Sequence, residues 1–161
     1  MTAAVLTVSD TSARGGRADL SGPAVKAALE HHKFKVIAAY VVADEQASIQ
    51  EAILEMAARA QLVVTTGGTG IAERDVTPEA TRAVCTRLVE GVAERMRVVG
   101  AQSTPLAALS RGVCGICGRA LVLNLPGSPQ GATESLNAVI ELLPHALELL
   151  AGNTPHDGRR R

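Results

Sequence analysis

The chain has 161 residues, of which 16 are basic and 16 acidic, so its formal net charge at pH 7 is zero. This balance excludes a global field that would attract nucleic acid or a membrane, and an aromatic content of 1% leaves few rings for base stacking. A hydrophobic content of 47% in a chain of this length favours one globular domain with an aliphatic core.

Cysteine usage indicates the compartment. Cys85, Cys114 and Cys117 are an odd set of three, which is typical of a reducing environment. The first ten residues have neither a basic stretch nor a cleavage site for a secretory signal. We therefore expect a cytoplasmic protein that binds small molecules, and neither nucleic acid nor membrane.

Four short apolar runs predict strands that are covered on both faces, as in a parallel sheet. They are residues 3–8, 36–43, 62–64 and 120–123. Apolar positions at helical spacing lie between and after them, at 49–60 and 136–150 and more briefly at 25–29, with weaker helical character at 77–86 and 91–102. Pro144 is expected to kink the last helix near residues 140–143.

This order of elements predicts an α/β fold with a mostly parallel sheet. Residues 112–118 form a further candidate strand, joined to 119–124 by a tight turn at Gly118, which would make the sheet mixed. We expect a single domain over residues 1–151 and a flexible tail over 152–161, where apolar periodicity is absent.

Polar clusters follow each predicted parallel strand. They are Ser9-Asp10, Asp44, Thr65–Gly70 with Arg74-Asp75, and Asn124–Pro129. Ligands of parallel α/β sheets bind outside the carboxyl ends of the strands. The four clusters are therefore expected to meet at one crevice.

The segment Thr66-Gly67-Gly68-Thr69-Gly70 has the chemistry of an anion cradle, because glycines allow positive φ and close approach of backbone amides. It is neither a P-loop nor a dinucleotide fingerprint, and an ordinary Gly-rich turn is an equally weighted interpretation. Thr77 and Ser128 each precede a Pro and are predicted helix N-caps. The special residues of 124–129 exceed what a cap needs, which favours a binding loop.

Asp44 and Asp75 are the acids best placed to hold Mg²⁺ beside bound phosphates. The alternatives are an N-cap for Asp44 and a turn or salt-bridge residue beside Arg74 for Asp75. Cys114 and Cys117 spell C-x-x-C, but a zinc site needs two more ligands and redox pairs of this spacing precede helices, so we interpret them as structural. The four His are scattered and suggest no site.

Several motifs together resemble the molybdenum-cofactor family of MogA, MoaB and the gephyrin G domain. The longest are Thr65–Gly70, Arg74–Ala80 and Asn124–Pro129, and the resemblance covers essentially all of residues 3–151. Shorter matches occur in the same order at 8–10, 19–23, 44–45 and 109–111. The resemblance implies a three-layer α/β fold with helices on both faces of the sheet, in a homotrimer or homohexamer.

The resemblance also implies adenylylation of molybdopterin by Mg-ATP, with release of pyrophosphate, and a molybdenum-insertion enzyme as a partner downstream. It assigns catalysis and metal binding to Asp44 and Asp75. Ligand binding falls to the residues that match the family's loops, which are Ser9, Asp10, Thr66, Gly67, Gly68, Thr69, Gly70, Ser110, Arg111, Asn124, Pro126, Gly127 and Ser128.

Three positions differ from the family pattern, since Thr11, Cys117 and Gln130 stand where the resemblance leads one to expect a basic residue. Each difference removes a positive charge. A non-catalytic molybdopterin carrier of the same fold is therefore the alternative function. A general phosphate-binding module is the third and least favoured hypothesis.

Overall fold

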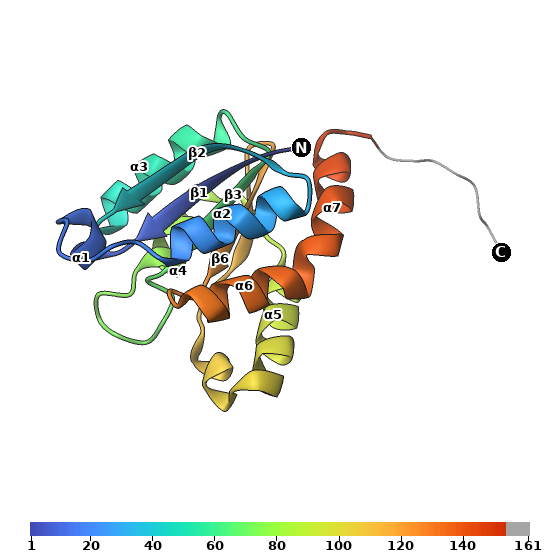
Figure 1. The fold of residues 1–161 in the computed structure, drawn as a ribbon. Coiled ribbons are helices and arrows are strands. Elements are labelled where there is room, and N and C mark those ends of the chain that lie inside the picture. The colour runs from blue at the N-terminus through green and yellow to red at the C-terminus, as the bar shows by residue number, and fades with distance from the viewer. Residues whose placement is uncertain (154–161) are drawn as a thin grey trace.

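Six strands form one mixed sheet in the computed structural model, which describes residues 1–153 (Figure 1). The order is β2-β1-β3-β6-β5-β4, in which β1, β2, β3 and β6 are parallel, β5 runs antiparallel to β6, and β4 runs antiparallel to β5. The bounds are Thr2–Val8 for β1, Lys35–Val42 for β2, Leu62–Thr66 for β3, Arg87–Leu88 for β4, Cys114–Cys117 for β5 and Ala120–Leu125 for β6.

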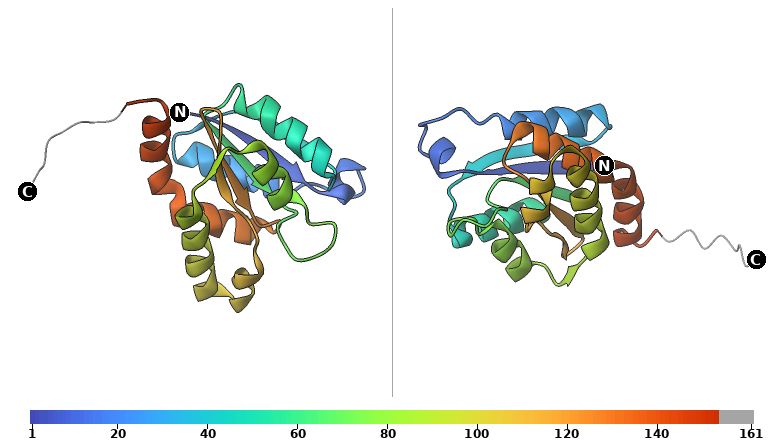
Figure 2. Two further views of the ribbon diagram at one scale, coloured as in Figure 1. Left: turned by 180° about the vertical axis from the view of Figure 1, so that it is seen from behind. Right: turned by 90° about the horizontal axis from the view of Figure 1, so that it is seen from below.

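Helices cover both faces of this sheet, which gives the three layers seen in Figures 1 and 2. One buried cluster joins the sheet to α2 (Ser21–His31), α5 (Glu90–Ser103), α6 (Pro129–Val139) and α7 (Leu143–Leu150). The other joins it to α3 (Gln46–Ala57) and α4 (Thr77–Val84). The predicted α/β class, the mixed sheet and the helices on both faces are confirmed.

The central strands are buried on both faces because alternate side chains enter opposite core clusters. Val63 of β3 packs on the side of α3, whereas its neighbour Val64 packs on the side of α2 and α6. Every residue of β3 and β6 is buried. This geometry explains why these strands read as continuous apolar runs.

The apolar stripe at 136–150 is broken rather than kinked. Helix α6 ends at Val139, a 3₁₀ turn, η2, covers Ile140–Leu142, and α7 starts at Leu143 with Pro144 in its first turn. Proline is tolerated there because the first amides of a helix have no intrahelical partner. The break lets one stripe serve two helices that point in different directions.

Three short elements have no counterpart among the predictions. They are α1 (Asp10–Ala13), β4 and the 3₁₀ helix η1 (Pro105–Leu109). No helix in the described part of the chain is long and apolar enough to cross a bilayer. The domain boundary near 151 stays a prediction, and residues 154–161 of the predicted tail lie outside the described residues.

Candidate functional site

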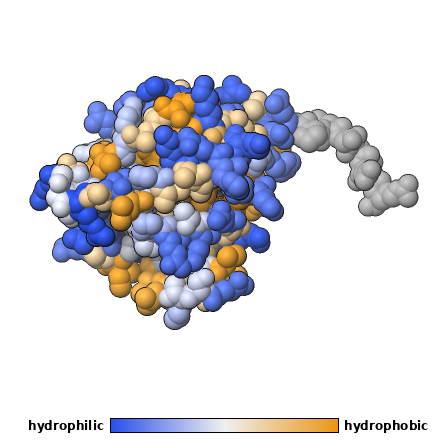
Figure 3. Space-filling view, in the orientation of Figure 1, coloured by the Kyte–Doolittle hydropathy of each residue, from blue (hydrophilic) through white to orange (hydrophobic). Residues whose placement is uncertain are grey.

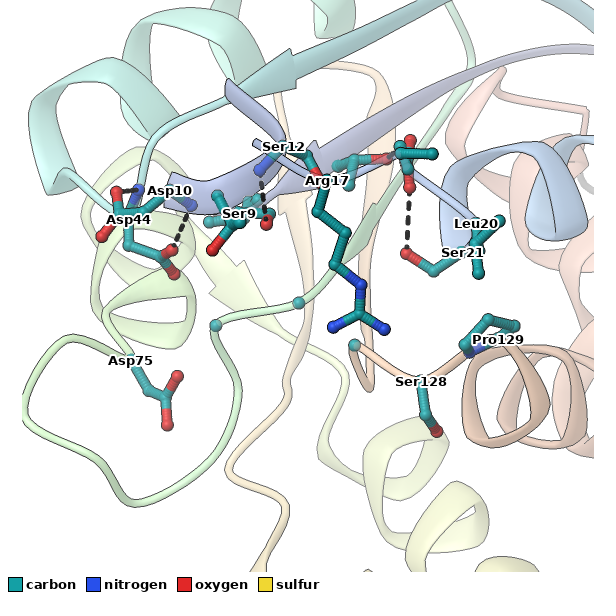
Figure 4. Close-up of a pocket in the computed structure, with 18 of the residues that line it drawn as sticks. Ser9, Asp10, Ser12, Arg17, Leu20, Ser21, Asp44, Asp75, Ser128 and Pro129 are labelled. Atoms are coloured by element: carbon teal, nitrogen blue, oxygen red, sulfur yellow. Dashed lines mark hydrogen bonds between the residues drawn. The ribbon is translucent and has the colours of Figure 1, made fainter. Parts of the chain in front are cut away.

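The carboxyl ends of the parallel strands open onto a cavity of about 400 Å³ (Figure 4). This volume is in the range of pockets that hold small-molecule ligands. Many of the predicted residues line it together, namely Ser9, Asp10, Asp44, Gly67, Gly68, Asp75, Gly127 and Ser128. The structure thus brings the ends of all four parallel strands to one crevice.

The Gly-rich loop forms one wall of the cavity in a conformation that requires glycine. Gly67 and Gly68 have φ of 99° and 65°, in the left-handed region. A Cβ on Gly67 would lie 2.3 Å from the carbonyl oxygen of Val8, and one on Gly68 would lie 2.3 Å from Oγ1 of Thr77. The loop backbone therefore packs directly against β1 and the start of α4.

Thr77 holds this loop, and its predicted role as an N-cap is wrong. The N-cap of α4 is Val76, and Thr77 is the first residue inside the helix. Its buried hydroxyl donates to the carbonyl oxygen of Gly67 at 2.9 Å, and its backbone N–H donates to that of Gly68 at 3.1 Å. Thr77 thus donates to the loop carbonyls, whereas the side chain of an N-cap would have accepted a hydrogen bond from a helix amide.

Asp44 and Asp10 orient each other at the ends of β2 and β1. The N–H of Asp10 donates to Oδ2 of Asp44 at 2.9 Å, and the N–H of Asp44 donates to Oδ1 of Asp10 at 2.9 Å. Asp44 is therefore not the cap of α3, whose N-cap is Glu45. Burial raises the pKa of Asp44, with smaller raising effects from the charges of Asp10 and Asp75 and a lowering effect from Arg74.

Asp75 lies across the Gly-rich loop from Asp44. Its Oδ2 accepts a hydrogen bond from the N–H of Ala72 at 3.0 Å, which supports the turn interpretation for that oxygen. No ion pair with Arg74 occurs among the described residues. The carboxylate points toward the cavity in Figure 4, and a Cβ on Gly70 would lie 2.7 Å from Oδ2.

Ser128 caps α6 as predicted, since its side chain accepts from the N–H of Gly131 at 3.1 Å. Pro129 follows in the first turn. The N-terminus of this eleven-residue helix lies at the cavity, because Gly127, Ser128 and Pro129 all line it. A helix N-terminus favours anions through its free amides and its dipole.

Two other predicted residues hold the strand ends together instead of lining this cavity. Thr66 is buried, and its hydroxyl donates to the carbonyl oxygen of Pro126 at 2.7 Å. Asn124 is 1% exposed, and its amide donates to the hydroxyls of Thr65 and Thr81 at 3.0 and 2.9 Å. These bonds fix the distance between β3, β6 and α4, on which the shape of the cavity depends.

Arg111 is also occupied by the protein itself. Its guanidinium donates to the carbonyl oxygens of Gly70 and Asp75, at 2.7 and 2.5 Å, and to the carboxylate of Glu79. The hydrogen bond from Arg111 holds the pKa of the Glu79 carboxyl below its usual value. Arg111 therefore ties the Gly-rich loop to the segment that carries Asp75.

A second cavity, of about 480 Å³, adjoins the first. The predicted residues Thr69, Gly70, Ser110 and Pro126 line it. Gly68, Asp75, Gly127 and Ser128 line both cavities and form the boundary between them. The site therefore has room for two ligands that meet at this boundary.

Arg17 and Asp19 line the first cavity, although Asp19 was noted only within the matching segment 19–23 and Arg17 was not noted at all. Asp19 accepts hydrogen bonds from the hydroxyl of Thr7 at 2.7 Å and from the N–H of Gly22 at 3.0 Å. The guanidinium of Arg17 projects into the space in Figure 4. The available signal was a basic residue in a Gly-containing loop directly after the first apolar strand.

The three expected basic positions have different surroundings. Thr11 lines the first cavity. Gln130 donates to Glu134 on the exposed side of α6, and Cys117 is buried opposite Ala120 at the far end of β6. Only one of the three differences therefore changes the charge on the wall of this cavity.

The C-x-x-C pair is split by the sheet. Cys114 lies in one core cluster and Cys117 in the other, because residues three apart on a strand point to opposite faces. Burial raises the pKa of Cys114 to about 12 and also raises that of Cys117. Among residues 1–153, no group of three or more Cys, His, Asp or Glu is arranged to hold a metal.

Comparisons with known proteins agree with this geometry. Residues 4–145 match the model of a family described as "Probable molybdopterin binding domain". A molybdopterin adenylyltransferase of Helicobacter pylori is 41% identical over 153 residues, which cover 92% of this chain and 87% of that protein.

Solved structures show the same similarity. The molybdopterin biosynthesis enzyme MoaB of Thermus thermophilus is 51% identical, with a TM-score of 0.88 over 94% of this chain and 96% of that one. A MogA structure is 40% identical, with a TM-score of 0.88 over 93% of this chain and 99% of that one. The chain belongs to the molybdenum-cofactor biosynthesis family.

Proposed function

We propose that this protein adenylylates molybdopterin, using Mg-ATP and releasing pyrophosphate. One observation carries the proposal: two carboxylates, a Gly-rich loop and a helix N-terminus converge on a cavity that adjoins a second one. The first cavity would hold the nucleotide and the second the pterin, with the reacting phosphates at their boundary. The name of the Helicobacter relative supports the same reaction.

Backbone amides supply the phosphate contacts in this proposal. Within residues 1–153, the N–H groups of Gly68, Gly127 and Ser128 donate no backbone hydrogen bond. All three residues line the boundary of the two cavities. Amides that already point at a site stabilise developing negative charge without reorganising during the reaction.

Asp44 and Asp75 are the residues that would hold Mg²⁺. Magnesium prefers oxygen ligands and is commonly bound by one or two carboxylates together with substrate phosphates. The two acids fit this donor set, because both adjoin the Gly-rich loop and their charges interact. When bound, the ion would neutralise charge on the phosphate oxygens.

The reaction needs no general base from the protein. An oxygen of the terminal phosphate of molybdopterin, already ionised near neutral pH, attacks the α-phosphorus of ATP. A new oxygen–phosphorus bond forms, the bond to the β-phosphate oxygen breaks, and pyrophosphate leaves with the electron pair. The residues that line the first cavity include no His, in agreement with this chemistry. Catalysis then consists of positioning and charge neutralisation.

Arg111 would act as a positioning residue in this scheme rather than as a ligand of the phosphates. Its guanidinium holds Gly70 and the backbone of Asp75 in place. Ser110 lines the second cavity and would contact the pterin side.

The proposal extends to assembly and location. We place the protein in the cytoplasm as a homotrimer or homohexamer that passes its product to a molybdenum-insertion enzyme. Leu106 and Leu109 of η1 are 68% and 49% exposed, and apolar surface gathers at the lower edge of the face in Figure 3. Light scattering on the purified protein tests the assembly, and a mass of one chain would contradict it.

The direct test of function combines purified protein with molybdopterin, ATP and Mg²⁺. We expect adenylylated molybdopterin and pyrophosphate in equal amounts. The variant Asp75→Asn should fold and bind molybdopterin but lose most turnover. Molybdopterin binding without pyrophosphate would instead support a carrier. Near-normal transfer by Asp75→Asn would remove the metal role of that residue.

A further inference from the structure

Arg17 places a free guanidinium inside the first cavity. The residue lies on the exposed loop between α1 and α2, and its side chain extends between Asp75 and Ser128 in Figure 4. Within residues 1–153, its guanidinium forms no ion pair and no hydrogen bond. Arg111, behind the Gly-rich loop, has its donors taken by protein oxygens. Arg17 thus keeps its donors for a ligand.

The cavity is lined by more acidic than basic residues, so a free cation at Arg17 can offset part of its negative charge. Four acids line it, Asp10, Asp19, Asp44 and Asp75, against two bases, Arg17 and Arg74. Without Arg17, four acids would face a single base, and a polyphosphate would meet net negative charge that Mg²⁺ offsets only in part. Arg74 interacts electrostatically with Asp44. Arg17 is the other base of the lining and offsets the remaining negative charge.

The two cavities indicate which phosphates Arg17 would meet. The reacting α-phosphate must lie at the boundary formed by residues that line both cavities, such as Gly68 and Ser128. Arg17 lines the first cavity and not the second. It therefore lies on the side of the boundary away from the pterin, where the leaving pyrophosphate extends.

We propose that Arg17 binds the β- and γ-phosphates of the nucleotide and holds the pyrophosphate as it leaves. This inference rests on the proposed function. A guanidinium presents a planar fork of donors that matches phosphate oxygens. Arg17 supplies the positive charge on the cavity wall that the uncharged Thr11 does not.

The loop around Arg17 is open on one side of this residue and anchored on the other. Gly15 has a φ of 73°, and a Cβ at that position would meet nothing within 4 Å. The far end of the loop is anchored by Asp19, which accepts hydrogen bonds from Thr7 and Gly22. Arg17 therefore sits between an open, glycine-containing segment and a fixed anchor.

Arg14 offers a matched control in the same loop. It is also an exposed Arg whose guanidinium forms no hydrogen bond or ion pair among residues 1–153, but it does not line the cavity. Arg14→Gln and Arg17→Gln remove the same charge from the same loop. A difference between them reports the position of Arg17 and not the change in net charge.

Titration calorimetry with Mg-ATP, Mg-pyrophosphate and AMP tests the inference. Arg17→Gln should raise the Kd for Mg-ATP and pyrophosphate roughly 10- to 100-fold, as expected for a lost charge-assisted hydrogen bond. It should change the Kd for AMP and for molybdopterin by less than about threefold, since neither ligand carries the β- and γ-phosphates. Arg17→Lys should restore part of the affinity, and Arg14→Gln should behave as wild type.

Two results would overturn the inference. One is equal pyrophosphate binding by Arg17→Gln and Arg14→Gln. The other is an equal loss for AMP and pyrophosphate, which would show a general disturbance of the cavity. A wild-type protein that binds pyrophosphate but forms no adenylylated molybdopterin would contradict the proposed function, while the comparison of the two Arg variants would still decide the role of Arg17.

Discussion

Single residues in the cavity carry charge at some expense of stability. Asp44 is partly buried beside Asp10 and Asp75, and its raised pKa shows that the fold disfavours its charged form. The backbone N–H of Asp10 offsets this effect only in part. An acid kept in such surroundings is better explained by a cationic ligand than by a structural role.

Replacing Asp44 by Asn should therefore abolish most turnover without loss of stability at neutral pH. The folded pKa is raised, so the protonated form of Asp44 contributes stability that is present below the unfolded value of 3.8 and is lost as pH rises through the folded pKa. The variant should be as stable as wild type near pH 4 and at least as stable at pH 7. Urea unfolding at both pH values measures this, and a clearly less stable variant at pH 7 would contradict it.

Thr77 gives a second prediction, about the loop it supports. Thr77→Val keeps the shape but leaves the carbonyl oxygen of Gly67 without its buried donor, which should lower the free energy of unfolding by about 1–3 kcal/mol. The looser loop should also raise the KM for ATP. Thr77→Ser retains the hydroxyl and is the control. Equal stability of the Val and Ser variants would show that this hydrogen bond contributes little.

At the scale of elements, the turn from β3 into the Gly-rich loop is the most constrained. Gly67→Ala places a Cβ 2.3 Å from a backbone oxygen at a φ of 99°, so steric overlap adds to backbone strain. We expect a loss of roughly 2–5 kcal/mol together with loss of ATP binding.

Gly118→Ala is the control for this loop, because Gly118 has a φ of 59° and open space around it. It should cost only about 1–2 kcal/mol, the strain of a left-handed backbone alone. Thermal unfolding and ATP titration of the two variants measure the difference. Similar losses for both would mean that the contact with β1 is unimportant.

Elements with their own apolar pattern could be predicted from sequence. The strands β1, β3 and β6 are buried along nearly their whole length, and α3 shows a regular stripe, so each has a local signal. The two-residue β4 exists only through pairing with β5, and α1 buries no residue. Such elements depend on tertiary contacts and carry no periodicity to detect.

The site was predictable to a similar degree. Strand order brings Asp10, Asp44 and Gly67 to one edge, and this follows from the rule for parallel sheets. The sequence did not reveal that Asn124 and Arg111 are occupied by protein groups, since that depends on where the ends of their side chains lie. The loop signal for Arg17 likewise did not show that its side chain turns toward the cavity.

For the whole molecule, the three thiols report on the integrity of the core. Burial raises the pKa of Cys85 to about 11 and that of Cys114 to about 12, so the reactive thiolate is at least about two orders of magnitude scarcer near neutral pH than in a free cysteine. Native protein should react slowly with iodoacetamide, and protein in urea should label at all three free cysteines.

The same thiols predict a loss of stability at high pH. Their neutral forms contribute stability that is complete below the ordinary value of 9.0 and is lost as pH rises toward about 11. Mass spectrometry counts the labels, and urea unfolding at rising pH measures the stability. Fast labelling of any thiol in the native state would show that the core opens readily.

The paired acids at the ends of β1 and β2 have a kinetic consequence. Asp10 and Asp44 are 34 residues apart, and their mutual hydrogen bonds can form only after a long crossover has brought the two strands side by side. Contacts of such sequence separation form late, because loop closure must come first. The cavity that we propose for the nucleotide would thus be assembled on the native side of the folding barrier. A bound nucleotide should then slow unfolding while leaving the rate of folding unchanged.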